Sequence, residues 1–187
     1  IPCDHIEAGT KKYFSHVIYS DDHGATWKLG GRTPLDQVNE CEVVELLDGA
    51  MLLNMRNYNR EKRSRQTAIS RDGGLTWSDQ THDATLIEPI CQAAVLRYRW
   101  QEGSTPGAIL FSNPASTQGR VNMTIRASLD DGKTWPTSHV LYPGPSGYSD
   151  LAKLRNGNIA CLFEAGTDNI AESIVFTQTV FDELKEP

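Results

Sequence analysis

The chain of 187 residues is 39% hydrophobic and 22% charged, which is typical of a soluble globular protein with one domain and a sizeable core. Its formal net charge of −6 argues against nucleic acid or an anionic membrane surface as a partner. No apolar run approaches the length of a membrane-spanning helix, and the four widely spaced cysteines form neither a zinc-binding pattern nor a disulfide scaffold.

The first predicted element is a strand-and-turn unit that recurs twice further along the chain. Apolar residues at 17–19 lead into the octapeptide SDDHGATW at 20–27. The octapeptides SRDGGLTW at 70–77 and SLDDGKTW at 128–135 follow similar residues. All three fit the pattern S-x-D-x-G-x-T-W, and their starts lie 50 and 58 residues apart. A match at five fixed positions in three places indicates a structural repeat.

Each octapeptide, called an Asp box from here on, has the residues of a tight turn. The aspartate can accept hydrogen bonds from backbone N–H groups, the glycine permits a left-handed backbone, and the tryptophan is expected to bury its ring against neighbouring strands. The alternative, an aspartate-rich metal loop, lacks enough regularly spaced oxygen ligands, so no metal is expected. The structural residues of the boxes are Asp22, Gly24 and Trp27; Asp72, Gly74 and Trp77; and Asp130, Gly132 and Trp135.

A second repeat has the same uneven spacing. Segments 44–51 and 152–159 contain Asp-Gly and Asn-Gly pairs, which are strong signals for hairpin turns, and a looser hairpin is predicted over 94–111. Their leucines, Leu46, Leu96 and Leu154, are again 50 and 58 residues apart. Short strands and turns that repeat at this period predict an all-β chain of about three to four β-propeller blades, each a four-stranded antiparallel sheet.

The shared register selects three residues. Glu40, Ile90 and Tyr148 each lie six residues before one of the aligned leucines, and Tyr148 ends a Pro/Gly-rich approach to a predicted strand. Equivalent positions of propeller blades converge around the central axis, so Glu40 and Tyr148 are expected to face each other. A tyrosine with a pKa of about 10 is a poor nucleophile unless a nearby carboxylate takes its proton. A packed aromatic and a solvated strand end are the alternatives, and these residues alone leave them open.

Two arginines are candidates for holding an anionic ligand. Arg56 ends the apolar strand predicted at 51–55, where a guanidinium is costly without a negative partner. Arg120 lies in a loop before another predicted strand. The planar guanidinium suits a carboxylate ligand. Each arginine by itself is also compatible with a surface position, and the run at 60–63 is interpreted as an exposed loop.

Together these segments resemble the sialidases (exo-α-sialidases, neuraminidases), a family with Asp boxes, or BNR repeats, on a six-bladed β-propeller. The resemblance covers essentially the whole chain. Residues 39–49 resemble the segment that carries the family's catalytic glutamate, here Glu40. Residues 53–56 and 111–120 resemble the segments with the second and third carboxylate-binding arginines, here Arg56 and Arg120. Residues 147–149 resemble the segment of the nucleophile, here Tyr148.

The resemblance implies a glycoside hydrolase that releases terminal α-linked sialic acid with retention of configuration. Tyr148 would form the glycosyl-enzyme, Glu40 would take its proton, and Arg56 and Arg120 would hold the carboxylate of the sugar. No metal or organic cofactor is implied. The expected partner is a sialylated glycan, and the substrate class implies a secreted, periplasmic or lysosomal setting.

Two features of the family have no match in residues 1–187: the first arginine of the carboxylate-binding triad and the aspartate acid/base. We therefore expect residues 1–187 to be the C-terminal part of a single sialidase-type propeller domain, with the N-terminal blades absent. The upstream half of the same propeller is then a partner, because an incomplete ring has open strand edges. By itself the chain is expected to be inactive.

Two other functions are compatible with parts of the pattern. A non-catalytic sialoglycan-binding or adhesion propeller would need the Asp boxes but no turnover. Another retaining glycosidase would need two carboxylates that face the site. Glu164, which aligns with Arg56 in the repeat, is the only obvious candidate for the second carboxylate, because Glu42 is expected to face away from Glu40.

Overall fold

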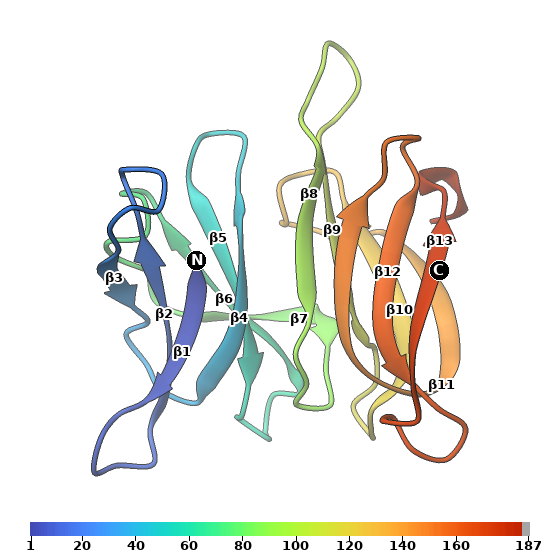
Figure 1. Cartoon of the computed structure of the whole chain (residues 1–187), viewed down its shortest axis with the longest axis horizontal. Helices are drawn as coiled ribbons and strands as arrows, with labels where there is room; N and C mark the ends of the chain where they lie inside the picture. Colours follow the sequence, from blue (N-terminus) through green and yellow to red (C-terminus); the bar gives the residue numbers. More distant parts are fainter. Residues whose placement is uncertain (185–187) are drawn as a thin grey trace.

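The computed structural model describes residues 1–184, and within them the fold consists of antiparallel β-strands and one short 3₁₀ helix, with no α-helix (Figure 1). The all-β prediction is confirmed, and none of the described residues form a helix with the length and hydropathy needed to cross a membrane. The elements are β1 (Pro2–Ile6), β2 (Tyr13–Tyr19), β3 (Lys28–Arg32), β4 (Val38–Glu45), β5 (Met51–Asn57), β6 (Ser64–Ser70), β7 (Thr81–Ile87), β8 (Ala94–Arg99), β9 (Ala108–Pro114), β10 (Val121–Ser128), β11 (Thr137–Lys153), β12 (Ile159–Ala165), β13 (Ser173–Thr179) and η1 (Phe181–Glu183).

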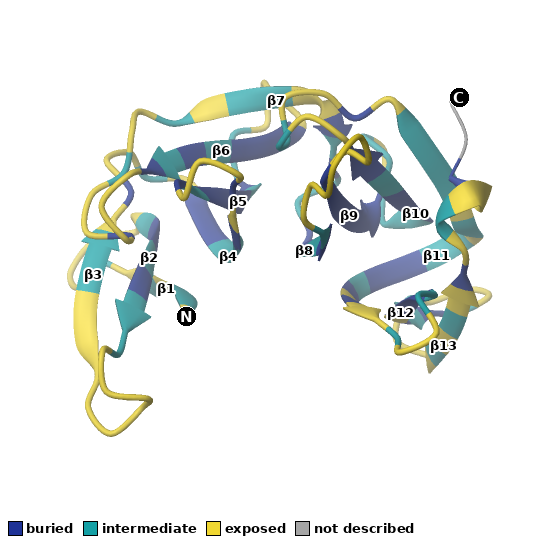
Figure 2. Ribbon diagram, turned by 90° about the horizontal axis from the view of Figure 1, so that it is seen from above, coloured by how far each residue is buried: buried dark blue, intermediate teal, exposed yellow. Residues whose placement is uncertain are grey.

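The strands form four antiparallel sheets that follow one another along the chain. The first contains β1–β3, the second β4–β7, the third β8–β10 with the start of β11, and the fourth the rest of β11 with β12 and β13. Strand β11 passes between sheets because Pro145 still pairs with β10, whereas Ser146 already pairs with β12. The sheets stand side by side on an arc, with β4 and β8 on its inner side and β3 and β7 on its outer side (Figure 2).

This arrangement is that of consecutive β-propeller blades, as the repeat predicts. The second and third sheets each have four strands, whereas the first and fourth have three among the described residues. When the sheets are aligned by their Asp boxes, β1 of the first sheet corresponds to β5 of the second. The first sheet therefore has no described counterpart of β4. The fourth sheet ends at the counterpart of β6. The described residues therefore contain two complete blades between two three-stranded ones.

The hydrophobic core lies between the sheets, where the apolar faces of neighbouring blades meet. Strand side chains alternate between the two faces of a sheet, and both faces of the third sheet are covered, so β9 is buried along its whole length. One apolar cluster, which includes Leu52, Phe111 and Trp135, joins the second and third sheets. A second cluster, which includes Ile125 and Phe163, joins the third and fourth. Packing between blades thus sets where the inner strands lie.

The Asp boxes are turns between antiparallel strands, and each carboxylate is engaged by its own turn. Asp72 accepts hydrogen bonds from the backbone nitrogen of Thr76 (2.9 Å), from Thr76 Oγ1 (2.6 Å) and from Ser70 Oγ (2.8 Å). The same three bonds recur at Asp22 and Asp130. The predicted left-handed backbone is confirmed at the box glycines, with φ of 87° at Gly24, 87° at Gly74 and 80° at Gly132.

The tryptophans of the boxes differ in burial, and the prediction for the first is wrong. Trp135 is buried and donates to Asp83 of the preceding sheet (2.9 Å). Trp77 donates to the carbonyl of Gly31, also in the sheet before its own (3.1 Å). Trp27 is 51% exposed, because its sheet is the first one described and no earlier sheet lies against the ring. The box tryptophan therefore joins a blade to the preceding blade.

We expect Asp72→Asn to lower stability at neutral pH and to remove part of the protein's acid sensitivity. The hydrogen bonds from Thr76 lower the pKa of Asp72 from 3.8 to about 2. The ionised carboxylate therefore stabilises the fold above pH 3.8, and that contribution is lost as the pH falls through 2. Thermal unfolding from neutral pH downward measures this: the difference in Tm between wild type and variant should shrink below pH 3.8.

The matched control is Asp79→Asn, because Asp79 is exposed just after the same box. This variant should unfold like the wild type at every pH. Equal losses of stability in the two variants, or a Tm difference that does not change with pH, would contradict the role assigned to Asp72.

Candidate active site

Glu40 and Tyr148 stand on the innermost strands of the second and fourth sheets, each at an irregularity in strand pairing. On β4 the register shifts between Val38 and Cys41, and β11 shows a comparable shift just ahead of Ser149. Such bulges turn a side chain out of the regular alternation of a strand and often lie next to active sites. The position of Tyr148 differs from the prediction: it lies within β11, which continues through the Pro/Gly-rich stretch.

The two side chains meet although they are 108 residues apart in the chain. Tyr148 Oη donates to Glu40 Oε1. Arg56, from the neighbouring strand β5, donates through Nη1 to Glu40 Oε2 (2.6 Å) and to Tyr148 Oη (3.0 Å). The side chains of Arg56 and Glu40 are 12% and 26% exposed, so the group is shielded from bulk water yet open to a ligand.

Arg120 lies next to the same phenol. Its guanidinium carbon is 5.7 Å from the centre of the Tyr148 ring, and its Nη2 donates to the carbonyl of Ile90 (3.2 Å). Ile90 is the register equivalent of Glu40 and Tyr148 in the third sheet, and it contributes this backbone carbonyl in place of a polar side chain. The structure thus brings all four predicted site residues to one place.

The surroundings keep Tyr148 neutral and Arg56 charged. Burial, followed by the hydrogen bond and the negative charge of Glu40, raises the pKa of Tyr148 to about 12. Burial acts to lower the pKa of Arg56, but the hydrogen bond and charge of Glu40 outweigh it, so this pKa is raised. At neutral pH the site holds an uncharged phenol whose proton already points at an acceptor. Such a group can transfer its proton at the moment its oxygen attacks.

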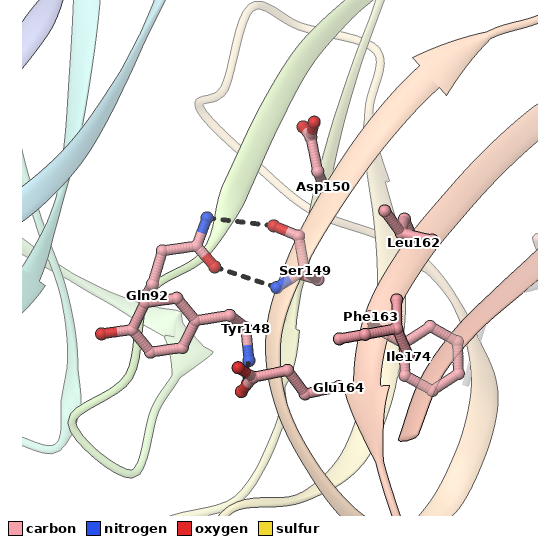
Figure 3. A pocket seen from close by; sticks show the side chains of 8 residues that line it. All are labelled: Gln92, Tyr148, Ser149, Asp150, Leu162, Phe163, Glu164 and Ile174. Carbon is pink, nitrogen blue, oxygen red and sulfur yellow. Dashed lines mark hydrogen bonds between the residues drawn. The ribbon is translucent and has the colours of Figure 1, made fainter. Parts of the chain in front are cut away.

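A cavity of about 270 Å³ opens beside Tyr148 against the fourth sheet (Figure 3). Glu164 on β12 lines it, and its Oε2 accepts the backbone N–H of Tyr148 (3.0 Å). A Cβ at position 147 would clash with the same oxygen, so Gly147 is needed for this contact. Glu164, considered from the sequence as a second catalytic carboxylate, instead holds the backbone at Tyr148.

Sequence reasoning missed two further polar groups near these residues. The side-chain amide of Gln92 forms two hydrogen bonds of 3.0 Å with the backbone of Ser149, directly after Tyr148 (Figure 3). Asp4 on β1 is near enough to feel the charge of Glu40, and burial followed by that charge raises its pKa. The repeat register singles out neither residue, because both lie outside the aligned positions.

Sequence reasoning also missed a buried ion pair, which joins Arg65 and Glu88. Arg65 Nη1 lies 2.7 Å from Glu88 Oε2, and the two side chains are 0% and 1% exposed. Arg65 closely follows the basic run at 60–63, which is exposed as predicted. No local signal separates a buried arginine from its exposed neighbours, so only the tertiary structure identifies this one.

The remaining reactive groups are not arranged as a second centre. Residues 1–184 contain no group of three or more His, Cys, Asp or Glu side chains that could hold a metal ion. The four cysteines are free thiols. Burial raises the pKa of Cys41 and Cys161 to about 12 and that of Cys91 to about 11. These three thiols are therefore protonated and unreactive at neutral pH.

The chain is similar in sequence to known proteins over most of its length. A family model described as a BNR repeat-like domain matches residues 1–161. The sialidase of Micromonospora viridifaciens is 41% identical over 154 residues, which are 80% of this chain and 23% of that protein. The sialidase of Bacteroides fragilis (strain YCH46) is 34% identical over 154 residues, 80% of this chain and 28% of that protein. The chain thus spans about a quarter of these relatives.

A solved structure is similar in fold. The Hadza microbial sialidase Hz136 matches with a TM-score of 0.81 at 34% sequence identity. The match covers 93% of this chain and 33% of that one. The same arrangement of sheets therefore occurs as one part of a larger protein.

Proposed function

Since the chain belongs to the family of BNR repeat-like domains and is similar to curated sialidases, we propose that it carries the nucleophile of an exo-α-sialidase. The reaction is hydrolysis of terminal α-linked sialic acid from glycoconjugates, with retention through a tyrosyl-enzyme intermediate. The observation that carries the proposal is the hydrogen-bonded group of Tyr148, Glu40 and Arg56.

The chemistry explains why a phenol would be used. Sialic acid bears a carboxylate on its anomeric carbon, which would repel a carboxylate nucleophile. In the first step Tyr148 Oη bonds to that carbon, its proton passes to Glu40, and the glycosidic bond breaks. The leaving oxygen takes a proton from a general acid outside residues 1–187. In the second step water attacks the same carbon, gives a proton to the conjugate base of that acid, and Tyr148 regains its proton from Glu40. Two inversions give retention.

Arg56 and Arg120 are proposed to hold the substrate carboxylate. Arg56 makes both of its hydrogen bonds through Nη1, which leaves Nη2 for a ligand. Arg120, which lies beside the Tyr148 ring, is fixed by a hydrogen bond to the carbonyl of Ile90. Charge-assisted bonds from two guanidinium groups would orient the sugar so that its anomeric carbon faces Tyr148.

We further propose that residues 1–187 are the C-terminal part of one propeller, whose other blades supply the first arginine and the acid/base. The end sheets support this, because each exposes large apolar side chains. On the fourth sheet Leu162 pairs with Phe176, and they are 47% and 58% exposed. On the first sheet Leu29 is 73% exposed. Residues 1–187 alone are then expected to be inactive, and the protein acts in a secreted, periplasmic or lysosomal setting, where sialylated glycans occur.

The test is hydrolysis of an α-sialoside by the full natural protein, followed by proton NMR. Free sialic acid should appear first as the α-anomer and convert to the β-anomer later. The β-anomer as first product would contradict the retaining mechanism. A sialoside that binds but is never cleaved would support the alternative, a non-catalytic sialoglycan-binding or adhesion propeller.

We expect Arg56→Lys in the full natural protein to raise KM for an α-sialoside by roughly tenfold or more, because a bond to a charged group is worth about 1.5–3 kcal/mol and an ammonium cannot reproduce the planar fork. Steady-state kinetics with a fluorogenic sialoside measure the effect. Arg60→Lys, in the exposed loop after β5, is the matched control and should not change KM. An unchanged KM in Arg56→Lys would count against the carboxylate-binding role.

A further inference from the structure

The buried pair of Arg65 and Glu88 is more elaborate than stability requires. Arg65 Nε donates to Asn54 Oδ1 on the adjacent strand β5 (2.6 Å), and Nη1 donates to Glu88 Oε2 (2.7 Å). Among the described residues Nη2 of Arg65 has no acceptor. Burying two charges costs about as much as their attraction returns, and an unpaired donor adds to the cost. The pair is therefore better explained by what it holds in place.

It holds the connector, residues 88–93, which leads from β7 to β8. Glu88 begins the connector, and Arg65 Nη1 also donates to the carbonyl of Cys91 (2.7 Å). One guanidinium thus fixes the chain on both sides of Pro89 and Ile90. Ile90 has a φ of 60°, which β-branched residues rarely adopt. Such strain persists only where surrounding contacts impose it, and Arg65 provides these contacts.

The connector in turn contacts two parts of the site. The carbonyl of the strained Ile90 accepts the hydrogen bond from Arg120 Nη2 (3.2 Å). Two residues later, the Gln92 amide pairs twice with the backbone of Ser149 at 3.0 Å. Ser149 follows Tyr148 directly, so the connector fixes both the orientation of Arg120 and the strand that carries the phenol.

Glu88, the acidic partner of Arg65, contacts the end of the strand that carries Arg56. Glu88 Oε1 accepts the backbone N–H of Asn57 (2.6 Å), the residue after Arg56. The ion pair therefore joins the end of β5, which carries Arg56, to the connector, which orients Arg120. These two arginines belong to different sheets, and the pair is the buried link between them.

We infer that Arg65 is a positioning residue that, through Glu88 and the connector, sets the placement of Arg56 and Arg120 and so the affinity for the substrate carboxylate. The inference rests on the proposed function. It assigns to Arg65 an effect on substrate binding although its side chain is fully buried.

The test is Arg65→Lys in the full natural protein. Lysine keeps the charge next to Glu88 but cannot donate in the same plane to Asn54, Glu88 and the Cys91 carbonyl. KM for an α-sialoside should rise by about tenfold or more, since a misplacement of about 1 Å can cost a hundredfold. The change in kcat should be smaller, because the carboxylate is held alike in ground state and transition state.

Rescue distinguishes positioning from a general loss of structure. Without the contacts from Arg65, Ile90 is expected to relax to negative φ and turn its carbonyl away from Arg120. Glycine adopts positive φ without strain. Adding Ile90→Gly to Arg65→Lys should therefore lower KM part of the way back to the wild-type value. If Arg65→Lys fails to fold, Glu88→Gln replaces it, because glutamine can still accept the Asn57 N–H.

The matched control is Arg97→Lys, at a second ion pair between sheets. Arg97 Nη2 lies 2.8 Å from Asp131 Oδ1, and Arg97 also donates to the carbonyl of Glu45, at the opposite end of β4 from Glu40. This variant should keep the wild-type KM. All variants are measured below their unfolding transitions, with Tm recorded on the same samples.

The outcomes separate the inference from the proposed function. Unchanged KM in Arg65→Lys, or a raised KM that Ile90→Gly does not restore, overturns the inference while the function stands. Titration calorimetry with the unsaturated (glycal) analogue of sialic acid measures binding affinity without turnover. A wild type that binds this analogue but cleaves nothing overturns the proposed catalysis, and weaker binding by Arg65→Lys then still supports the inference. A wild type that neither binds nor cleaves overturns both.

Discussion

Replacing Tyr148 by phenylalanine in the full natural protein is expected to lower kcat for α-sialoside hydrolysis by at least about a thousandfold, because the atom that forms the covalent bond is gone. The fold should persist. Glu40 keeps its ion pair with Arg56 (2.6 Å), and the ring of Phe retains its place beside Arg120. Kinetics with a fluorogenic sialoside and Tm measurements test the two halves of this expectation.

Mass spectrometry sharpens the test. A fluorinated sialosyl fluoride, which slows breakdown of a glycosyl-enzyme, should add one sialosyl group to the peptide containing Tyr148 in the wild type and none in the variant. Tyr98→Phe is the matched control, because it also removes a phenol hydrogen bond, to the carbonyl of Gly157 (2.6 Å), near the end of β8 that is farther from the connector. Full turnover by Tyr148→Phe would remove this residue from the mechanism.

Glu40→Gln is expected to lower kcat by about a hundredfold to ten-thousandfold, the usual contribution of a general base. Glutamine has the same shape but does not take up the phenol proton. The Glu40→Gln substitution is also expected to change the pKa of Tyr148. Because the charge and hydrogen bond of Glu40 help to raise the pKa of Tyr148 to about 12, that pKa should fall in the variant.

NMR titration of protein labelled with ¹³C in tyrosine measures the pKa of Tyr148, with Tyr148→Phe to assign the signal. Glu45→Gln provides the control, since Glu45 is an exposed carboxylate at the other end of the same strand. It should change neither kcat nor the pKa. A Glu40→Gln variant with wild-type kcat would show that another group accepts the proton.

The Asp boxes were predictable because their interactions are local. Every donor to Asp72 lies within four residues of it, so the octapeptide carries its own turn. The exposure of Trp27 was not predictable from the same pattern, because the partner of a box tryptophan belongs to the preceding sheet. Glu40 and Tyr148 could be paired in advance only because two repeats share one uneven spacing and repeated units take equivalent places in space.

The sequence by itself determined the repeating β architecture, the turns and the pairing of Glu40 with Tyr148, since these follow from short-range hydrogen bonding and from the period of the repeat. Arg56 and Arg120 were candidates because of their places beside predicted strands and the resemblance to sialidases. Only the tertiary structure decided how those residues are held. The bulges that aim Glu40 and Tyr148, the strained carbonyl of Ile90 and the Arg65–Glu88 pair depend on contacts between sheets. Such contacts join residues far apart in the chain, and their geometry is set by packing, which no local pattern of residue types encodes.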